Sequence, residues 1–211
     1  MKKIYTLTAL LSILLVNNAI AQNDAAAQKT IDAVNAKIKS LKGFTASYTS
    51  VTIDKNKKAL GTLKGTVTLK GKKFYATMGK AEIISDGTKL WNYDGDKEVT
   101  VGKAEDAAAD WLSPQVFIDG IDTKDFSYTL ISTTGSIQQV QLLPVDKRKN
   151  ITQVILFIDK TKSLITKINL TDKSGSTTII SFSNLNTNAV IPDTKFVFDA
   201  AKHPGVEVVE Q

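Results

Sequence analysis

Residues 81–93 constrain the fold more than any other stretch of this 211-residue chain. Two short apolar runs flank Ser85-Asp86-Gly87, and a glycine there supplies the positive φ that a tight turn needs. The stretch therefore predicts a β-hairpin. A three-residue loop places Ile83, Trp91 and Tyr93 on one face, whereas a strict two-residue Asp-Gly turn separates Ile83 from Trp91. We favour the three-residue loop because it collects the large rings on one apolar surface.

Alternating apolar and polar residues predict further strands on both sides of this hairpin. The alternation begins at Phe44 and continues through residues 63–69 and 74–78. Turn-forming residues such as Asp94-Gly95-Asp96 separate the later runs, which predict strands at 97–102, 126–132, 136–143, 151–158, 163–171, 175–183 and 194–199. Because helices do not alternate with these strands, the pattern indicates an antiparallel meander.

An amphipathic helix is predicted ahead of the strands. Its apolar residues recur at helical spacing: Ile31, Val34, Ile38 and Leu41. Asn23 or Asp24 can cap its start, and Gly43 is placed to stop it after Lys42. Two short helices are predicted at 104–111 and 114–119, where serine precedes proline at a first helical position.

The first residues predict a secretory signal peptide. Met1-Lys2-Lys3 is basic, residues 4–20 are mostly apolar, and cleavage is expected after Ala21. The alternative is an uncleaved membrane anchor, but the apolar run is shorter than the ~20 residues that a span needs. Residues 22–211 are then expected to form one domain. The absence of cysteine excludes disulfides, thiolate metal sites and lipidation after the signal.

Charge and residue types narrow the classes of function. The chain is basic, with a formal net charge of +6, yet Arg148 is its only arginine, and no basic stretch is interleaved with aromatic residues. We therefore expect no nucleic-acid partner. His203 is the only histidine and is expected in a surface turn, which argues against histidine-based catalysis and metal sites. Paired carboxylates stay open among the 21 acids, but neither enzymatic activity nor a cofactor or metal is expected.

Four segments resemble the LolA family, periplasmic carriers of outer-membrane lipoproteins. Residues 83–93 resemble the central hairpin of that family, and residues 61–74 resemble its glycine-started strand and the segment after it. Ser113-Pro114-Gln115-Val116-Phe117-Ile118 resembles its second helix. Residues 196–208 resemble its closing strand. The resemblance spans about residues 28–209, in the order of the family.

The resemblance implies both a fold and a function. The fold is α+β, a strongly curved antiparallel sheet that forms an unclosed β-barrel with a three-helix lid. The function is periplasmic transport of lipoproteins, with their acyl chains in a hydrophobic cavity, by a monomer. Its partners would be acylated lipoproteins, an inner-membrane lipoprotein-releasing transporter and an outer-membrane acceptor.

The predicted ligand-binding residues combine this resemblance with the apolar faces of the predicted strands and helices. They are Leu63, Val67, Leu69, Phe74, Ala76, Met78, Ile83, Trp91, Trp111, Val116, Phe117 and Ile118. Lys70-Gly71 stands where the family has a lid-gripping arginine before proline, and Ala76 stands where it has tryptophan. Lysine has no planar fork, so Lys70 is predicted to be a weaker latch on the carbonyls at the end of the 104–119 insert.

Two alternatives remain open at this point. A carrier of the same fold could transport another hydrophobic molecule, such as a glycolipid or a pigment precursor. The apolar alternation is also compatible with a structural or sensory β-domain whose interior is simply packed.

Overall fold

The computed structural model describes residues 24–105 and 120–210. The predicted signal peptide and nearly all of the two predicted insert helices lie outside these residues. Within them, one α-helix and a single twelve-stranded sheet form the fold, and two short 3₁₀ helices follow β11. The strands are β1 (Phe44–Ile53), β2 (Ala59–Lys70), β3 (Lys73–Met78), β4 (Ala81–Ser85), β5 (Lys89–Tyr93), β6 (Glu98–Lys103), β7 (Phe126–Thr134), β8 (Ile137–Pro144), β9 (Ile151–Asp159), β10 (Leu164–Asp172), β11 (Thr177–Asn186) and β12 (Glu207–Glu210).

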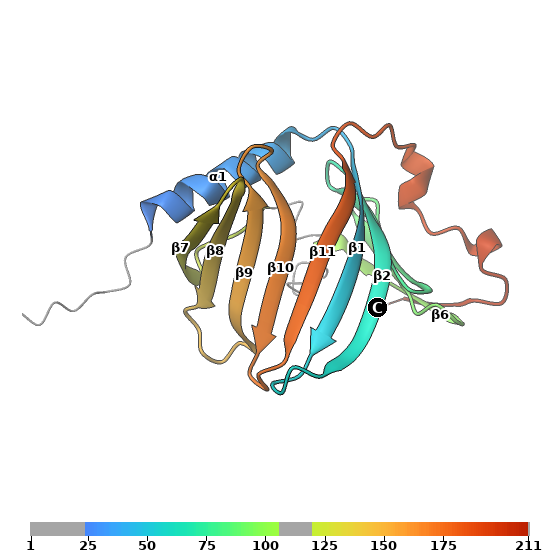
Figure 1. The fold of residues 1–211 in the computed structure, drawn as a ribbon. Coiled ribbons are helices and arrows are strands. Elements are labelled where there is room, and N and C mark those ends of the chain that lie inside the picture. Colours follow the sequence, from blue (N-terminus) through green and yellow to red (C-terminus); the bar gives the residue numbers. More distant parts are fainter. Residues whose placement is uncertain (1–23, 106–119, 211) are drawn as a thin grey trace, which may run out of the picture.

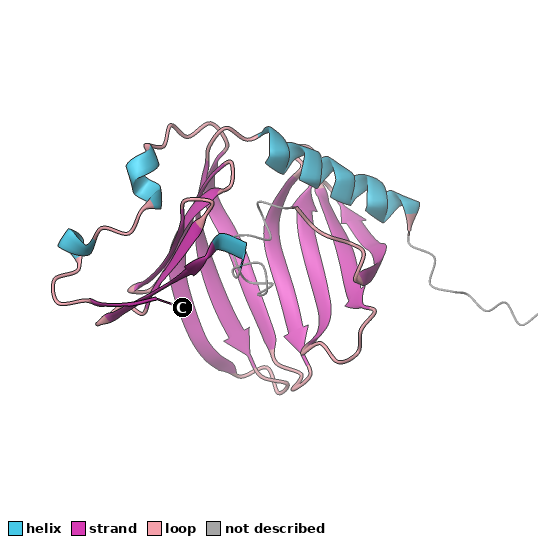
Figure 2. Ribbon diagram, turned by 180° about the vertical axis from the view of Figure 1, so that it is seen from behind, coloured by secondary structure: helices cyan, strands magenta, loops and turns pink. Residues whose placement is uncertain are grey.

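The sheet consists of two local meanders joined in the middle. The strand order is β12-β6-β5-β4-β3-β2-β1-β11-β10-β9-β8-β7, so the first meander runs from β1 to β6 and the second from β7 to β11. β1 and β11 pair antiparallel from Thr45↔Asn186 to Ile53↔Thr177 and connect the halves. Figure 2 shows how strongly the sheet curves, and its edges are not paired with each other. The predicted unclosed barrel is confirmed.

The C-terminal region departs from the predicted meander. The strand predicted at 194–199 is wrong: Asp193–Phe196 forms the 3₁₀ helix η2 after Pro192, and Ala200–Lys202 forms a second one, η3. β12 then pairs parallel to β6 at the edge of the sheet. Phe196 is fully buried although it belongs to no strand, because this segment lies across the outer face of the sheet.

The hairpin at residues 81–93 forms, but in another register. Ile84 pairs with Trp91 and Ser85 with Leu90, which leaves a four-residue loop. The Asp86 carboxylate explains the longer loop, because it accepts hydrogen bonds from the N–H groups of Thr88 (2.8 Å) and Lys89 (2.7 Å). Directly paired residues share a face, so Ile83 and Trp91 lie on opposite faces and that part of the prediction is wrong.

The helix α1 (Ala25–Ser40) crosses one end of the sheet. As predicted, its apolar stripe faces inward, and Ile31 and Val34 are completely buried. Gly43 does not stop the helix, which ends at Ser40 and is followed by Leu41 in an extended conformation. Glycine is needed at position 43 for another reason: a Cβ there would lie 2.1 Å from the carbonyl oxygen of Ala189.

Asp24 fastens the start of α1 to the edge strand β7. Its carboxylate caps the helix by accepting from the N–H of Ala26 at 2.7 Å. The other carboxylate oxygen accepts from the N–H of Leu130 at 3.0 Å, and the Asp24 N–H donates to the Tyr128 carbonyl at 3.2 Å. The hydrogen bond from Leu130, followed by that from Ala26, lowers the pKa of Asp24 below its ordinary value of 3.8. One side chain thus positions the helix over the second meander.

Replacing Asp24 with alanine should therefore lower the melting temperature, because the helix loses its cap and its tie to β7. Asp32→Ala removes the same charge from an exposed position of α1 and should change the melting temperature much less. Since the pKa of Asp24 is depressed in the folded state, its contribution is present above pH ~4 and is lost as the pH falls further. Thermal unfolding followed by circular dichroism between pH 3 and pH 7 would test this, and equal melting temperatures for the two variants would contradict it.

Candidate ligand-binding site

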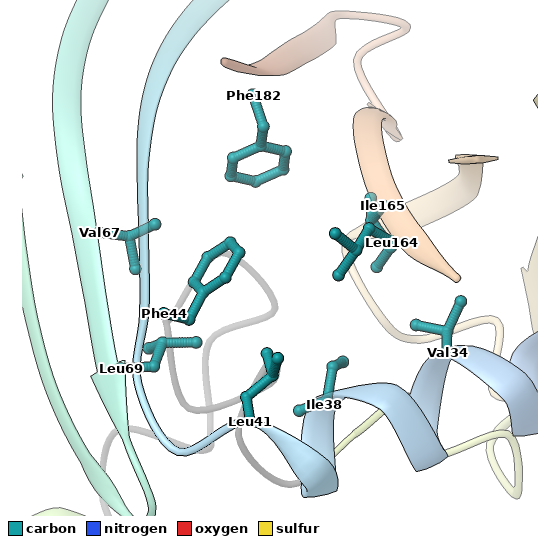
Figure 3. A pocket seen from close by; sticks show the side chains of 9 residues that line it. All are labelled: Val34, Ile38, Leu41, Phe44, Val67, Leu69, Leu164, Ile165 and Phe182. Carbon is teal, nitrogen blue, oxygen red and sulfur yellow. The ribbon is translucent and has the colours of Figure 1, made fainter. Parts of the chain in front are cut away.

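A pocket lies on the concave face of the sheet, beside the last turns of α1 (Figure 3). Every residue that lines it is apolar: Val34, Ile38, Leu41, Phe44, Val67, Leu69, Leu164, Ile165 and Phe182. The hollow measures about 460 Å³, a volume that includes space open to solvent. A lining without polar side chains suits a hydrocarbon ligand, because it offers no groups for recognising a polar one.

The pocket occupies the seam between two separate hydrophobic cores. The larger core packs α1 against the second meander, from β7 to β10, around residues such as Val140, Leu142 and Val154. The smaller core lies on β1 to β5 and contains Phe74 and Leu90. Phe182 on β11 packs against both. The two cores do not merge at this point, and four apolar residues of the pocket lining are only partly buried: Ile38, Leu41, Phe44 and Phe182.

Five of the predicted binding residues share the concave face of the first meander. Val67 and Leu69 line the pocket, and their strand partners are Ala76 and Phe74. Ile83 on β4 is the direct strand partner of Ala76 and packs against the smaller core. Phe74 is fully buried, so it packs behind the residues that line the pocket and does not form part of the pocket surface. Binding of a ligand by these residues remains a prediction.

Leu63 and Met78 lie on the same face but outside the pocket, and are 47% and 45% exposed. The Tyr48 side chain separates these two residues from the pocket. Its ring lies across Gly65, and its hydroxyl donates to the Thr77 carbonyl at 2.7 Å. A Cβ at position 65 would lie 2.7 Å from this ring, so glycine is what permits the crossing.

Trp91 does not face the pocket, which corrects the prediction for this residue. It shares the outer face with Ile84 and Tyr75. The C-terminal segment covers that face: the Lys195 ammonium lies 3.4 Å from the centre of the Tyr75 ring, and Tyr93 contacts the Phe198 ring. Burial, with Glu82 nearby, raises the pKa of Tyr75 to about 12. The remaining predicted residues, Trp111, Val116, Phe117 and Ile118, lie outside the described residues.

Several lining residues were not predicted as part of a site. Val34, Ile38 and Leu41 were recognised only as the apolar stripe of a helix. Phe44, Leu164, Ile165 and Phe182 belong to strands whose alternation is visible in the sequence. Alternation identifies the buried face of a strand, but it does not show which buried residues meet across a distant pairing. That information lies in the β1–β11 ladder.

Lys70 contacts the segment between β11 and η2, and its role as a lid latch remains a prediction. Its ammonium group donates to the Ile191 carbonyl at 2.8 Å and to the Asp193 carboxylate at 3.0 Å. Lys73 lies 3.2 Å from the same carboxylate. Hydrogen bonds from Lys70 and then Lys73 hold the pKa of Asp193 below its usual value. The predicted partners, at the end of the 104–119 insert, lie outside the described residues.

Residues 24–105 and 120–210 contain no group of three or more histidine, aspartate or glutamate side chains arranged to hold a metal ion. His203 begins a turn, since its carbonyl accepts from the N–H of Val206 at 3.2 Å, but its side chain is only 16% exposed, stacks on Phe198 and lies 3.8 Å from Glu82. No helix in these two stretches is long and apolar enough to span a bilayer.

The two hydrogen bonds of Lys70 lead to a prediction about the segment between β11 and η2. Lys70→Met should speed hydrogen exchange of amides in residues 187–196 severalfold, because both contacts that hold the segment to β2 are lost. Lys70→Arg should preserve slow exchange, since a guanidinium can donate to both acceptors. Lys72→Met is the matched control, being an exposed lysine in the same turn. Equal exchange in the methionine variants would show that the segment is held in another way.

Comparison with known proteins gives a consistent result. The family model of the outer membrane lipoprotein carrier protein LolA matches residues 39–199. An outer-membrane lipoprotein carrier protein from Neisseria meningitidis is 28% identical over 211 residues, which cover 99% of each chain. Another from Nitrosospira multiformis is 26% identical over 79% of this chain and 81% of its own. The crystal structure of an uncharacterised conserved protein from Thermus thermophilus, 10% identical, superposes with a TM-score of 0.60 over 88% of this chain and 99% of its own. This last likeness shows the fold alone.

Proposed function

This chain belongs to the LolA family of outer-membrane lipoprotein carrier proteins, and we propose that it carries the acyl chains of lipoproteins in the apolar pocket on its concave face. The observation that supports this most directly is the lining of the pocket by nine apolar side chains. The proposed route is across the periplasm, from the inner to the outer membrane. The predicted signal peptide at residues 1–21 agrees with that route.

The energetics of an acyl chain explain why such a pocket is useful. Burying a methylene gains about 0.8 kcal/mol, so a long chain gains on the order of 10 kcal/mol by leaving water. A lipoprotein is therefore insoluble unless its chains are covered during transfer. A carrier must also release its cargo, so the pocket cannot be allowed to realise all of this gain. A pocket at the seam of two cores meets both needs, since contact with the ligand is extensive but not enclosed.

The division of the sheet supports a way to adjust affinity. Pocket walls come from both meanders, and α1 closes one side. Small changes in the angle between the halves would alter every wall contact at once, and a ligand that fits one angle better shifts the equilibrium towards it. The Lys70 latch would limit this motion at one end by fastening the chain that leaves β11 to the end of β2.

The proposal includes partners but no chemical step. The protein would act as a monomer, receive lipoproteins from an inner-membrane releasing transporter and deliver them to an outer-membrane acceptor. Binding, shielding and transfer require no bond to be made or broken, so we propose neither enzymatic activity nor a cofactor.

A charge in the pocket wall should weaken binding of apolar ligands. Leu41→Glu should weaken binding of an environment-sensitive fatty-acid analogue by roughly tenfold or more, because the carboxylate must be desolvated when the ligand enters. Val190→Glu introduces the same charge at a fully exposed position and should leave binding unchanged. Fluorescence titration, with circular dichroism as a check on folding, would decide. If wild type binds no probe in its native state, the interior is a packed core.

Release of lipoproteins from membranes tests the nature of the cargo. Spheroplasts of the source organism with newly made lipoproteins should release them into solution when the protein and an energy source are present, whereas the Leu41→Glu variant should release few. Immunoblotting of the supernatant measures the result. Normal binding of the fatty-acid analogue without any release would favour the alternative, a carrier of the same fold for another hydrophobic molecule.

A further inference from the structure

Three neighbouring connections concentrate positive charge at the end of the sheet opposite α1. They are residues 54–58 between β1 and β2, residues 145–150 between β8 and β9, and residues 172–176 between β10 and β11. Together they contain seven basic side chains and three carboxylates, an excess of four positive charges, compared with +6 for the entire chain. We call these three connections the basic end.

Contacts between the connections make the basic end one continuous surface. A Cβ at Gly175 would lie 3.2 Å from the Cβ of Lys55, so the first and third connections touch. Lys173 links the third connection to the second, since its N–H donates to the Asn150 carbonyl at 2.9 Å and its ammonium to the Arg148 carbonyl at 3.1 Å. Figure 1 shows the three connections side by side along the lower end of the sheet.

The carboxylates of the basic end are already engaged by their own connections. Asp54 accepts from the N–H groups of Asn56 and Lys58, and Asp172 from those of Ser174 and Ser176. Asp146 binds the Arg148 guanidinium, with contacts of 2.9–3.2 Å. Lys149 has a partner too, Asp125 at 2.6 Å.

The lysines of the first connection are left without such partners. The ammonium groups of Lys55, Lys57 and Lys58 form no ion pair or hydrogen bond with any described residue, and all three side chains are exposed. Lys147 is also exposed, and its ammonium donates only to a carbonyl. The uncompensated charge of the basic end is therefore carried by flexible ammonium groups.

Exposed apolar side chains accompany these charges. Leu60, two residues beyond Lys58, is 60% exposed, and Val145 in the second connection is 66% exposed. Ammonium groups next to exposed apolar side chains match an anionic bilayer surface, where phosphates meet the charges and apolar groups enter the interface. The only arginine, Arg148, is bound by Asp146. Its planar guanidinium, the group best suited to bind a carboxylate of a protein partner in two places, is therefore already occupied.

We propose that the basic end binds the headgroups of anionic phospholipids and docks the protein reversibly on a bilayer surface. Only a few charges contribute, and salt screens them, so docking is weak enough for the protein to leave again. Docking would bring a carrier close to the membranes that supply and accept its cargo. The docking itself requires neither cargo nor the pocket.

Sedimentation with vesicles tests this proposal. Wild type should bind vesicles containing 40% phosphatidylglycerol in phosphatidylcholine at low ionic strength, and should bind pure phosphatidylcholine vesicles much more weakly. The triple variant Lys55→Gln/Lys57→Asn/Lys58→Gln should lose on the order of 100-fold in partition coefficient. Asparagine is chosen at position 57 because Lys57 has a left-handed backbone (φ 69°) that asparagine adopts readily. Binding of wild type should fall as salt is raised.

A matched control removes three exposed lysines elsewhere. Lys29→Gln/Lys39→Gln/Lys42→Gln lowers the net charge by the same amount near the opposite end of the sheet and should retain most of the binding. Equal losses in the two triple variants would mean that net charge alone attracts the protein, which would overturn the proposal. Equal sedimentation of wild type with both kinds of vesicle would overturn it too, and no binding to either kind would favour an acidic protein as partner of the basic end. The Leu41→Glu variant should dock like wild type, so failure of docking is distinguishable from failure of the carrier function.

Discussion

The antiparallel ladder between β1 and β11 is the interaction on which the site depends. Each meander forms from neighbouring strands and has its own hydrophobic core, so neither needs the other to pair locally. The ladder joins strands more than 120 residues apart in the sequence, for example at Thr45↔Asn186. Phe44, Val67 and Leu69 reach the pocket from one side of it, and Leu164 and Ile165 from the other. Without this pairing the two walls would not face each other.

The helix determines where the apolar surface remains open. α1 has 16 residues, about 24 Å of helix, and Asp24 fixes its first turn to β7 at the far edge of the second meander. From there it covers the second meander and ends at Ser40, and its last turns line the pocket. The smaller core continues beyond the reach of the helix. Length and anchoring of one helix thus leave the seam accessible, while the bulk of both cores is packed as in any globular protein.

The sequence allowed most strands and the first helix to be predicted, because alternation and helical spacing are local signals. It failed where a distant contact or a side chain overrides the local pattern. The hairpin register differs from the predicted one because the Asp86 carboxylate accepts hydrogen bonds from two N–H groups of the loop. Phe196 and Phe198 alternate like a strand, yet their segment packs across the sheet instead of pairing. Only two of the nine pocket residues, Val67 and Leu69, were predicted, for a similar reason: they lie near recognisable motifs, whereas Phe182 enters through the β1–β11 ladder.

The central claim is that the seam between the two cores holds acyl chains of a lipoprotein, and the cargo itself tests this most directly. Native mass spectrometry of the protein, purified without detergent from the soluble fraction of its own cells, should show a population whose added mass is that of an acylated polypeptide. Fragmentation should release that polypeptide, and the population should be absent from the Leu41→Glu variant. A spectrum with only the bare chain, or with a bound lipid that carries no polypeptide, would contradict the account.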